Sequence, residues 1–227
     1  APDGAFRARN SLLGDNVNSG PAVVGAPNAG YPSDLETVDY ADFVAANTDT
    51  RCFDAQGSRR SAGWDREPMV YFGANDGMLH GVSACSGEER IAYVPNSVFG
   101  NLSALTSPQY RHRYFVDGSP TVMDAFWSGA WHTVLVGTTR AGGKGVFALD
   151  VTAPSRFDEA NAGELVLWEM QGGALGTPFE HLGYSFSQPA VIKAKGLGWV
   201  AGFGNGYDSA TGSAALFVAR IDTGELL

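Results

Sequence analysis

The sequence has little positive charge. Its 227 residues include 15 Lys and Arg against 24 Asp and Glu, which gives a net charge of −9. Nucleic-acid binding depends on basic side chains that neutralise phosphates, so this balance argues against a nucleic-acid partner. Charged residues make up 17% of the chain, below the usual ~25%. No apolar run approaches the ~20 residues that a membrane-spanning helix needs, and we expect no membrane span.

Cysteine is also scarce. Cys52 and Cys85 are the only two cysteines, and they lack the C-x-x-C spacing of zinc or thioredoxin-like sites. The residues leave two alternatives: one disulfide in an oxidising compartment, or two free thiols that pack as small hydrophobic groups. The four histidines, His80, His112, His132 and His181, are too far apart in the sequence to form a pair with metal-ligand spacing.

Catalytic motifs are missing as well. The glycine-rich run 137–145 contains a lysine, but no Ser or Thr follows it and the next element is predicted to be a strand, so it does not match a phosphate-binding loop. No Gly-x-Ser-x-Gly elbow of a serine hydrolase is present. We therefore assign no catalytic, cofactor-binding or metal-binding residue, and we expect a protein that is not an enzyme.

Clusters of Asp and Asn raise the question of calcium. They contain Asp15, Asn75, Asp76, Asn205 and Asp208. A calcium loop has oxygen ligands at alternating positions and ends in a bidentate carboxylate, and none of these clusters has that order. We interpret them as turn residues, although the sequence alone leaves open whether one of them binds a metal.

What the sequence has in excess is glycine, at 30 residues, and the glycines belong to a repeated pattern. A proline at the start of a β-rich run occurs three times, at Pro21, Pro120 and Pro189. Each run is followed by an apolar strand that ends near a glycine, then a turn and a second apolar strand. A Gly-Glu turn comes next, at 87–88, 163–164 and 224–225, and after the first two it leads into an outer strand. Each repeat therefore predicts a four-stranded meander, which is one blade of a β-propeller.

The repeats predict an all-β fold of about three consecutive blades. Their approximate ranges are 15–97 with an insert at 26–67, 114–171, and 184–227, where the last repeat stops as its fourth strand should begin. Propellers typically have four to eight blades, so we expect an incomplete ring that further blades or other chains complete. One or two short helices are predicted in the inserts: one within 95–108, with Asn96 or Ser97 as N-cap, and a turn or two within 38–46.

The insert at 26–67 is the longest departure from the repeat. Long loops on a rigid scaffold commonly carry recognition, so we predict that this insert is the main interaction surface. The aromatic side chains have two interpretations, because exposed ones could stack on a sugar or a peptide while buried ones would wedge between blades. The tryptophans concerned are Trp64, Trp127, Trp131, Trp168 and Trp199.

Several strings of this sequence resemble the PilY family. They include SLLGD at 11–15, VYFGANDGMLH at 70–80, YFVDGSP at 114–120, GVFALDV at 145–151 and FGNGY at 203–207. That family, with its neisserial PilC relatives, comprises type IV pilus tip-associated adhesins and assembly factors of Gram-negative bacteria. The resemblance covers nearly the whole chain and implies part of a C-terminal propeller of modified, quinoprotein-like form.

The resemblance also implies a location and partners. It implies secretion and display at the pilus tip or outer membrane, with minor pilins and host surface receptors as partners. Pilus extension, surface sensing, attachment, twitching motility and virulence are the implied roles. An oxidising location favours the Cys52–Cys85 disulfide. The family's calcium-binding loop would lie downstream of residue 227, so no calcium ligand transfers to this chain. The alternatives are a quinoprotein-like enzyme, although the adjacent cysteines that some of those enzymes use are absent, and a glycan-binding propeller.

Overall fold

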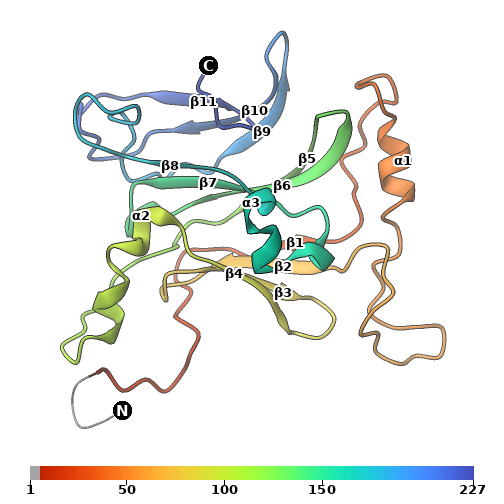
Figure 1. The fold of residues 1–227 in the computed structure, drawn as a ribbon, viewed down its shortest axis with the longest axis horizontal. Coiled ribbons are helices and arrows are strands. Elements are labelled where there is room, and N and C mark those ends of the chain that lie inside the picture. Colours follow the sequence, from red (N-terminus) through yellow and green to blue (C-terminus); the bar gives the residue numbers. More distant parts are fainter. Residues whose placement is uncertain (1–5) are drawn as a thin grey trace.

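The computed structural model describes residues 6–227 as three antiparallel sheets that follow one another along the chain (Figure 1). The first contains β1 (Ala22–Val24), β2 (Met69–Gly73), β3 (Leu79–Ser83) and β4 (Glu89–Tyr93). The second contains β5 (Thr121–Trp127), β6 (Ala130–Thr138), β7 (Gly145–Asp150) and β8 (Val166–Gln171). The third contains β9 (Ala190–Ala194), β10 (Gly198–Gly204) and β11 (Leu216–Arg220). In every sheet, strands that are consecutive in sequence pair with each other, which confirms the predicted meanders.

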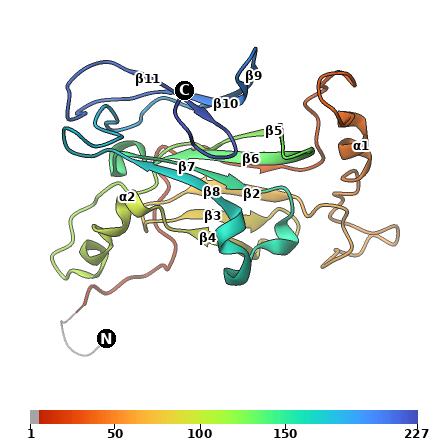
Figure 2. The ribbon, with the colours of Figure 1, turned by 45° about the horizontal axis from the view of Figure 1, so that its top comes forward.

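The first strands of the three sheets lie next to one another, β1 beside β5 and β5 beside β9. Each begins directly after a proline, whose missing N–H removes one ladder donor at a position that can do without it. The segments before β1 and β5 also bond to each other: the Gly20 amide donates to Ser119 Oγ (2.8 Å) and Ser19 Oγ donates to the Gly118 carbonyl (2.9 Å). The repeats therefore meet at their first strands and fan outward from there, as Figures 1 and 2 show.

The middle sheet is buried on both faces. Leu135, Phe147 and Leu149 pack with residues of the first sheet such as Met69 and Tyr71. Their neighbours in β6 and β7, at the alternate positions, pack instead against the third sheet: these are Val134, Val136, Val146 and Ala148. Because successive side chains of a strand point to opposite faces, a sheet between two others has an almost continuous apolar sequence.

The helices are few and short. α1 (Tyr40–Ala45) begins where Asp39 accepts a hydrogen bond from the Ala41 amide (2.9 Å), within the range predicted for a turn or two. The single helix expected in 95–108 is instead divided into α2 (Asn96–Phe99) and a 3-10 segment (Leu102–Thr106). Its N-cap is Pro95, not Asn96 or Ser97, and Pro95 makes no side-chain capping bond. A cap that supplies no acceptor is consistent with so short a helix.

The Gly-Glu pairs do not all form the same structure. Gly87 and Gly224 have positive φ angles of 76° and 71°, as tight turns after a strand require. The pair at 163–164 lies instead within α3 (Ala162–Leu165), so the expectation of a turn there is wrong. Beyond Gly224, Leu226 forms an isolated bridge with Ala219 of β11.

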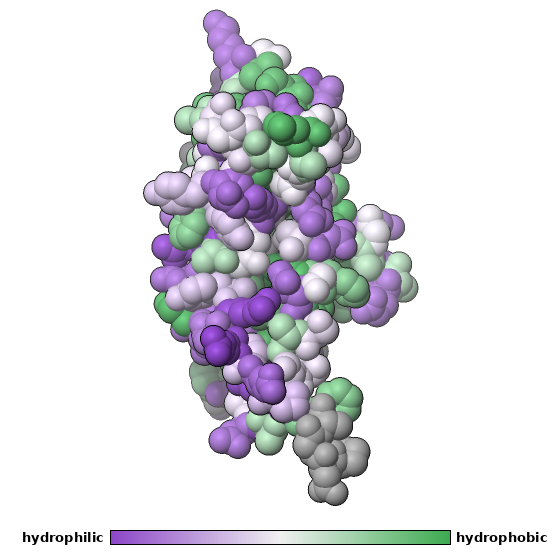
Figure 3. Space-filling model, turned by 90° about the vertical axis from the view of Figure 1, so that its left-hand side faces the viewer, coloured by the Kyte–Doolittle hydropathy of each residue, from purple (hydrophilic) through white to green (hydrophobic). Residues whose placement is uncertain are grey.

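No helix within residues 6–227 is long and apolar enough to cross a membrane. Figure 3 shows the face at the end of the molecule opposite α1, where hydrophobic side chains lie in small groups among hydrophilic ones.

Candidate recognition site in the insert of the first blade

The insert between β1 and β2 consists of two parts with different environments. Residues 27–47, here called the docked half, pack against the second and third blades. Residues 48–65, the tethered half, form an exposed loop beside the first blade. Figure 1 shows the insert, in orange, at the end of the molecule that carries α1. The predicted interaction surface is therefore not one continuous displayed loop.

The docked half is held by aromatic contacts. Tyr31 stacks on Trp131, with ring centroids 5.3 Å apart, and meets the edge of Trp199 at the same distance. Tyr40 packs edge-on against Trp131 at 4.9 Å. The indole nitrogens are also used: Trp131 donates to the Val38 carbonyl (2.8 Å) and Trp199 to the Glu36 carboxylate (2.7 Å). These contacts join the insert to two blades at once.

A buried hydrogen-bond network lies beneath this contact. The Tyr40 hydroxyl donates to Asp124 (2.5 Å) and accepts from the Ala29 amide (3.0 Å), and Thr133 donates to the other Asp124 oxygen (2.5 Å). Burial and the hydrogen bond to Asp124 raise the pKa of Tyr40 above its usual range. Burial, with the Asp124 charge nearby, raises the pKa of Tyr31 to about 12. Both tyrosines are therefore held in their neutral form.

The tethered half has ion pairs and one covalent link in place of a core. Asp49 pairs with Arg51 (3.0 Å) and Arg60 (2.8 Å), and these bonds hold the pKa of the Asp49 carboxyl well below its usual range. Cys52 is joined by a disulfide bond to Cys85, which lies in the turn between β3 and β4. This confirms the expected pairing and ties the loop to the body of the first blade.

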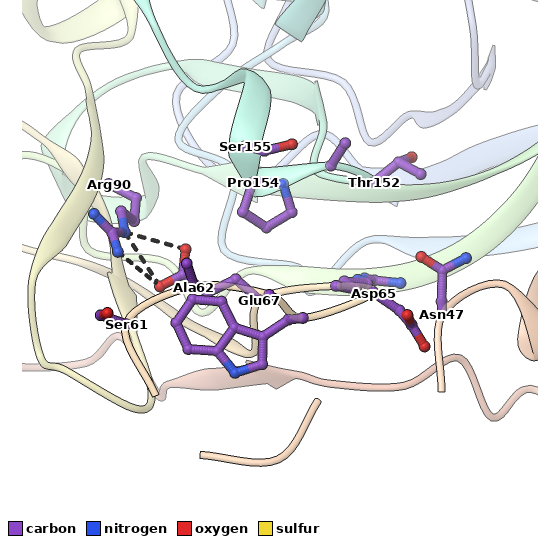
Figure 4. A pocket seen from close by; sticks show the side chains of 13 residues that line it. Asn47, Ser61, Ala62, Asp65, Glu67, Arg90, Thr152, Pro154 and Ser155 are labelled. Atoms are coloured by element: carbon purple, nitrogen blue, oxygen red, sulfur yellow. Dashed lines mark hydrogen bonds and ion pairs between the residues drawn. The ribbon is translucent and has the colours of Figure 1, made fainter. Parts of the chain in front are cut away.

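A pocket of about 320 Å³ lies between the end of the tethered half and the second blade. Figure 4 shows Thr152, Pro154 and Ser155 along one side of it and Ala62 and Glu67 on the other. At one end, the Arg90 guanidinium forms a two-pronged pair with Glu67, at 3.0 to 3.2 Å.

Arg66 also lines this pocket and is the least satisfied polar residue near it. Its residue exposure is 3%, and its three guanidinium nitrogens are buried without a hydrogen-bond partner within residues 6–227. Burial lowers the pKa of this guanidinium, but an arginine side chain stays protonated in proteins. The same side chain lines a second cavity of about 140 Å³ next to Asp124 and Thr133. Nothing in the sequence pattern marks Arg66 as unusual.

The Asp and Asn clusters of the first blade form ordinary pairs. Asp15 lies 2.7 Å from His112 Nε2 and accepts from Asn75 (3.3 Å). Asp76 lies 3.2 Å from His80 Nε2, whose other nitrogen is 2.5 Å from Glu89. Burial opposes the charged form of Asp76 and of His80, but these bonds outweigh it, so the pKa of Asp76 is lowered and that of His80 is raised.

The clusters of the third blade are separate from these. Asn205 holds its loop closed through the carbonyls of His181 (2.8 Å) and Ser213 (2.7 Å). Asp208 pairs with Lys144 (2.9 Å). Within residues 6–227, no three His, Cys, Asp or Glu side chains are grouped as a metal site would need.

The tryptophans differ in burial, and those in the core support the expectation that such side chains wedge between blades. Trp131, Trp168 and Trp199 are buried in the cluster between the second and third blades. Trp127 stacks on His132 at 3.8 Å. Trp64 is half-buried and lines the 320 Å³ pocket.

A family model described as the PilY1 beta-propeller domain matches residues 13–226. The chain belongs to this family. This confirms both the resemblance to the PilY family and the propeller fold, and it explains why three similar sheets follow one another. Another comparison agrees: the crystal structure of the Pseudomonas aeruginosa PilY1 C-terminal domain superposes with a TM-score of 0.64 at 38% identity, covering 90% of this chain and 35% of that one.

Curated relatives of the PilY1 family are longer than this chain. The type IV pilus biogenesis factor PilY1 of Pseudomonas aeruginosa is 42% identical over 229 residues, which is 97% of this chain but 17% of that protein. A PilY1 homolog of Xylella fastidiosa is 39% identical over 98% of this chain and 14% of its own length. The chain thus spans about a sixth of the length of these relatives.

Proposed function

We propose that this chain is a non-enzymatic module of a type IV pilus biogenesis factor, displayed at the pilus tip or cell surface. There it supports pilus assembly and extension, surface attachment and twitching motility. The observation that carries the proposal is the PilY1 propeller-domain match over residues 13–226, together with relatives named for pilus biogenesis. The calcium site that the resemblance implies would lie downstream of residue 227 and stays a prediction.

The disulfide supports the proposed location. Disulfides persist in oxidising environments such as the periplasm and the cell surface. Cys52 and Cys85 are the chain's two cysteines and they are paired with each other.

The tethered half is the surface that we assign to a partner, with minor pilins as the proposed class. Its tip is a small turn in which Phe53 pairs with Arg59, and the Phe53 side chain is exposed. The docked half holds the base of this loop against two blades, so the tip projects from a rigid support. Rigid presentation lowers the ordering cost of binding.

The experiment replaces residues 53–59 with a short Gly-Ser linker in the full-length protein of the native organism, leaving Cys52 in place. Export and protein level should stay normal while surface piliation, twitching and attachment fall toward those of the deletion strain. The matched control replaces the exposed turn 195–197 between β9 and β10, which should leave all three unchanged. A deletion strain with normal piliation, twitching and attachment would contradict the proposed function.

The absence of enzymatic activity is tested separately. The full-length protein is mixed with pyrroloquinoline quinone, calcium and an electron acceptor. We expect binding to purified minor pilins and no turnover of added alcohols or sugars. Calcium-dependent turnover would favour the quinoprotein alternative instead.

A further inference from the structure

The outer strand of the first blade has one open edge. β4 pairs with β3 on one side and has no strand on the other within residues 6–227. The Ala74 amide bonds to the Met78 carbonyl (3.0 Å), which fixes how the bonds alternate along the hairpin and the ladder beyond it. On that alternation, the paired residues Gly81 and Ile91 bond to each other, so the N–H and C=O of Ala92 point to the open side.

A groove of about 450 Å³ lies beside this edge. β4 forms one wall, and the segment 157–166, which contains α3, forms the other (Figures 1 and 2). Ile91 and Tyr93 of β4 pack on the apolar cluster between the first two blades but stay partly exposed, and so do Phe157 and Val166 across the groove. These side chains give the groove a mostly apolar lining.

Unpaired backbone groups beside an apolar groove suit an extended segment of another protein. In such a complex the main chain supplies the hydrogen bonds, and alternate side chains fill pockets. Ile91 and Tyr93 lie on the face of β4 that meets the second blade, where the Tyr93 ring packs 5.1 Å from that of Phe147. An added strand would place every second side chain on the same face. The segment should therefore have apolar residues at alternate positions.

The charges around the groove indicate which kind of segment it accepts. Arg90 lines the groove but is already paired with Glu67 (3.0 Å) and Glu88 (3.2 Å). Asp158 and Glu159 also line it, are exposed, and form no ion pair within residues 6–227. This negative rim is complementary to a basic side chain. A second copy of this chain, which also carries a net charge of −9, would be repelled.

We propose that the open edge of β4 receives an extended segment of a partner protein as a fifth strand of the first blade. The segment has apolar side chains at alternate positions and a Lys or Arg that meets Asp158 or Glu159. Its main chain bonds to Ala92, and its apolar side chains pack beside Ile91 and Tyr93. The inference goes beyond the proposed function, because it adds a surface separate from the tethered half and is tested without pili.

The test uses the full-length protein and a fluorescent peptide, KVTVTVK, whose binding is followed by anisotropy. Two further peptides carry N-methyl groups, one on its valine amides and the other on its threonine amides. Successive amides of a strand point to opposite sides, so only one of these two peptides can still pair with β4. One should bind about tenfold or more weakly, while the other stays within about twofold of the parent peptide.

Variants of the protein test the same contacts from the other side. Ala92→Pro removes the amide that faces the groove, at a place on an edge strand where proline is tolerated, and should weaken binding about tenfold or more. Ala92→Ser is the matched control: it keeps the backbone, changes an exposed side chain, and should bind within about twofold of the wild type. Glu159→Lys should weaken binding by about two- to fivefold.

Folding of each variant is checked by its thermal midpoint and by the absence of free thiols. The methylated peptides need no variant, so they decide the question even if Ala92→Pro unfolds. No binding of KVTVTVK at millimolar concentration would overturn the inference. So would equal affinity of the two methylated peptides, or equal affinity of the wild type and a folded Ala92→Pro variant. Self-association of the wild type that Ala92→Pro abolishes would also overturn it, because a second copy would then fill the groove.

Discussion

The two halves of the first-blade insert are adjacent in sequence but are held in place by different forces. The docked half, 27–47, buries Tyr40 to 2% exposure, and its Tyr31 stacks on Trp131 and meets the edge of Trp199. The tethered half, 48–65, has no residue in the hydrophobic clusters and is held by the disulfide and by the ion pairs of Asp49 with Arg51 and Arg60. The docked half belongs to the core, while the tethered half is attached to it.

This difference shows that the length of a loop does not establish its role. A long insert is a reasonable candidate for recognition, but 27–47 acts as a clamp across two blades. The part available to a partner is the shorter stretch that follows. The docked half positions the tethered half, because the two are joined by one continuous backbone.

The largest expected effect on stability comes from removing Tyr40, which anchors the docked half in the core. Tyr40→Ala removes a buried ring and should lower the free energy of unfolding by about 3–5 kcal/mol. Tyr40→Phe keeps the ring but leaves Asp124 without one donor, so it should cost about 1–3 kcal/mol. Urea denaturation of the purified proteins measures both. A Tyr40→Ala variant within about 1 kcal/mol of the wild type would show that the docked half is not part of the core.

Removing the Cys52–Cys85 disulfide should have the next largest effect on stability. The disulfide closes a loop with a sequence separation of 33, for which chain entropy predicts about 3–4 kcal/mol at most. The Cys52→Ser, Cys85→Ser double variant should become sensitive to chymotrypsin at Phe53 and Trp64. The docked half, which contains Tyr31, Tyr40 and Phe43, should stay resistant. Mass spectrometry of the digest identifies the cleavage sites, and first cleavage within 27–47 would reverse the comparison.

Alkaline pH should act on the docked half, because 48–65 contains no tyrosine. Tyr31 and Tyr40 stay protonated in the folded protein above pH 10, whereas unfolded tyrosine ionises from its usual pKa of 10.0. The unfolded state then binds fewer protons, so stability is complete below pH 10 and is lost as the pH rises through about 12.

Denaturation midpoints and absorbance at 295 nm after a pH jump measure this effect. Tyr40→Phe should reduce the loss of stability but not abolish it, since burial also raises the pKa of Tyr71. Stability that is constant from pH 9 to about pH 12 would show that these hydroxyls are not buried in solution.

The smallest effect is expected for the exposed end of the ion pairs in the tethered half. Arg51→Met should shift the thermal midpoint very little, because the Arg51 side chain is 73% exposed and its pair with Asp49 is screened by water and salt. Any shift should disappear in high salt. A clear loss of stability that persists in high salt would mean that the tethered half has a core of its own. Differential scanning fluorimetry at low and high salt is sufficient.

The blades could be predicted because each strand carries its own local signal. Pro120 before β5 and the alternating burial of β6 and β7 follow from the order of residues along the chain. The short helices were less predictable, since 163–164 repeats the Gly-Glu pattern but forms part of α3. The Gly-Glu pair alone therefore does not decide between a turn and a helix at this position.

The site was harder to predict from the sequence, because it depends on contacts between residues that are far apart along the chain. Tyr40 and Asp124 are 84 residues apart, and Glu36 and Trp199 are 163 apart. No periodicity relates such pairs. The unsatisfied guanidinium of Arg66 is visible once the fold shows which acceptors are already used. The disulfide was the exception: two cysteines allow a single intramolecular pairing, and the oxidising location that the family resemblance implies favoured that pairing over free thiols.

Hydrogen exchange followed by mass spectrometry tests the division of the insert most directly. It compares the native protein with the reduced and alkylated protein. The account predicts slow exchange in 27–47 in both forms, and exchange in 48–65 that is faster to begin with and becomes faster still on reduction. Equal protection of the two halves, or loss of protection in 27–47 on reduction, would contradict the account.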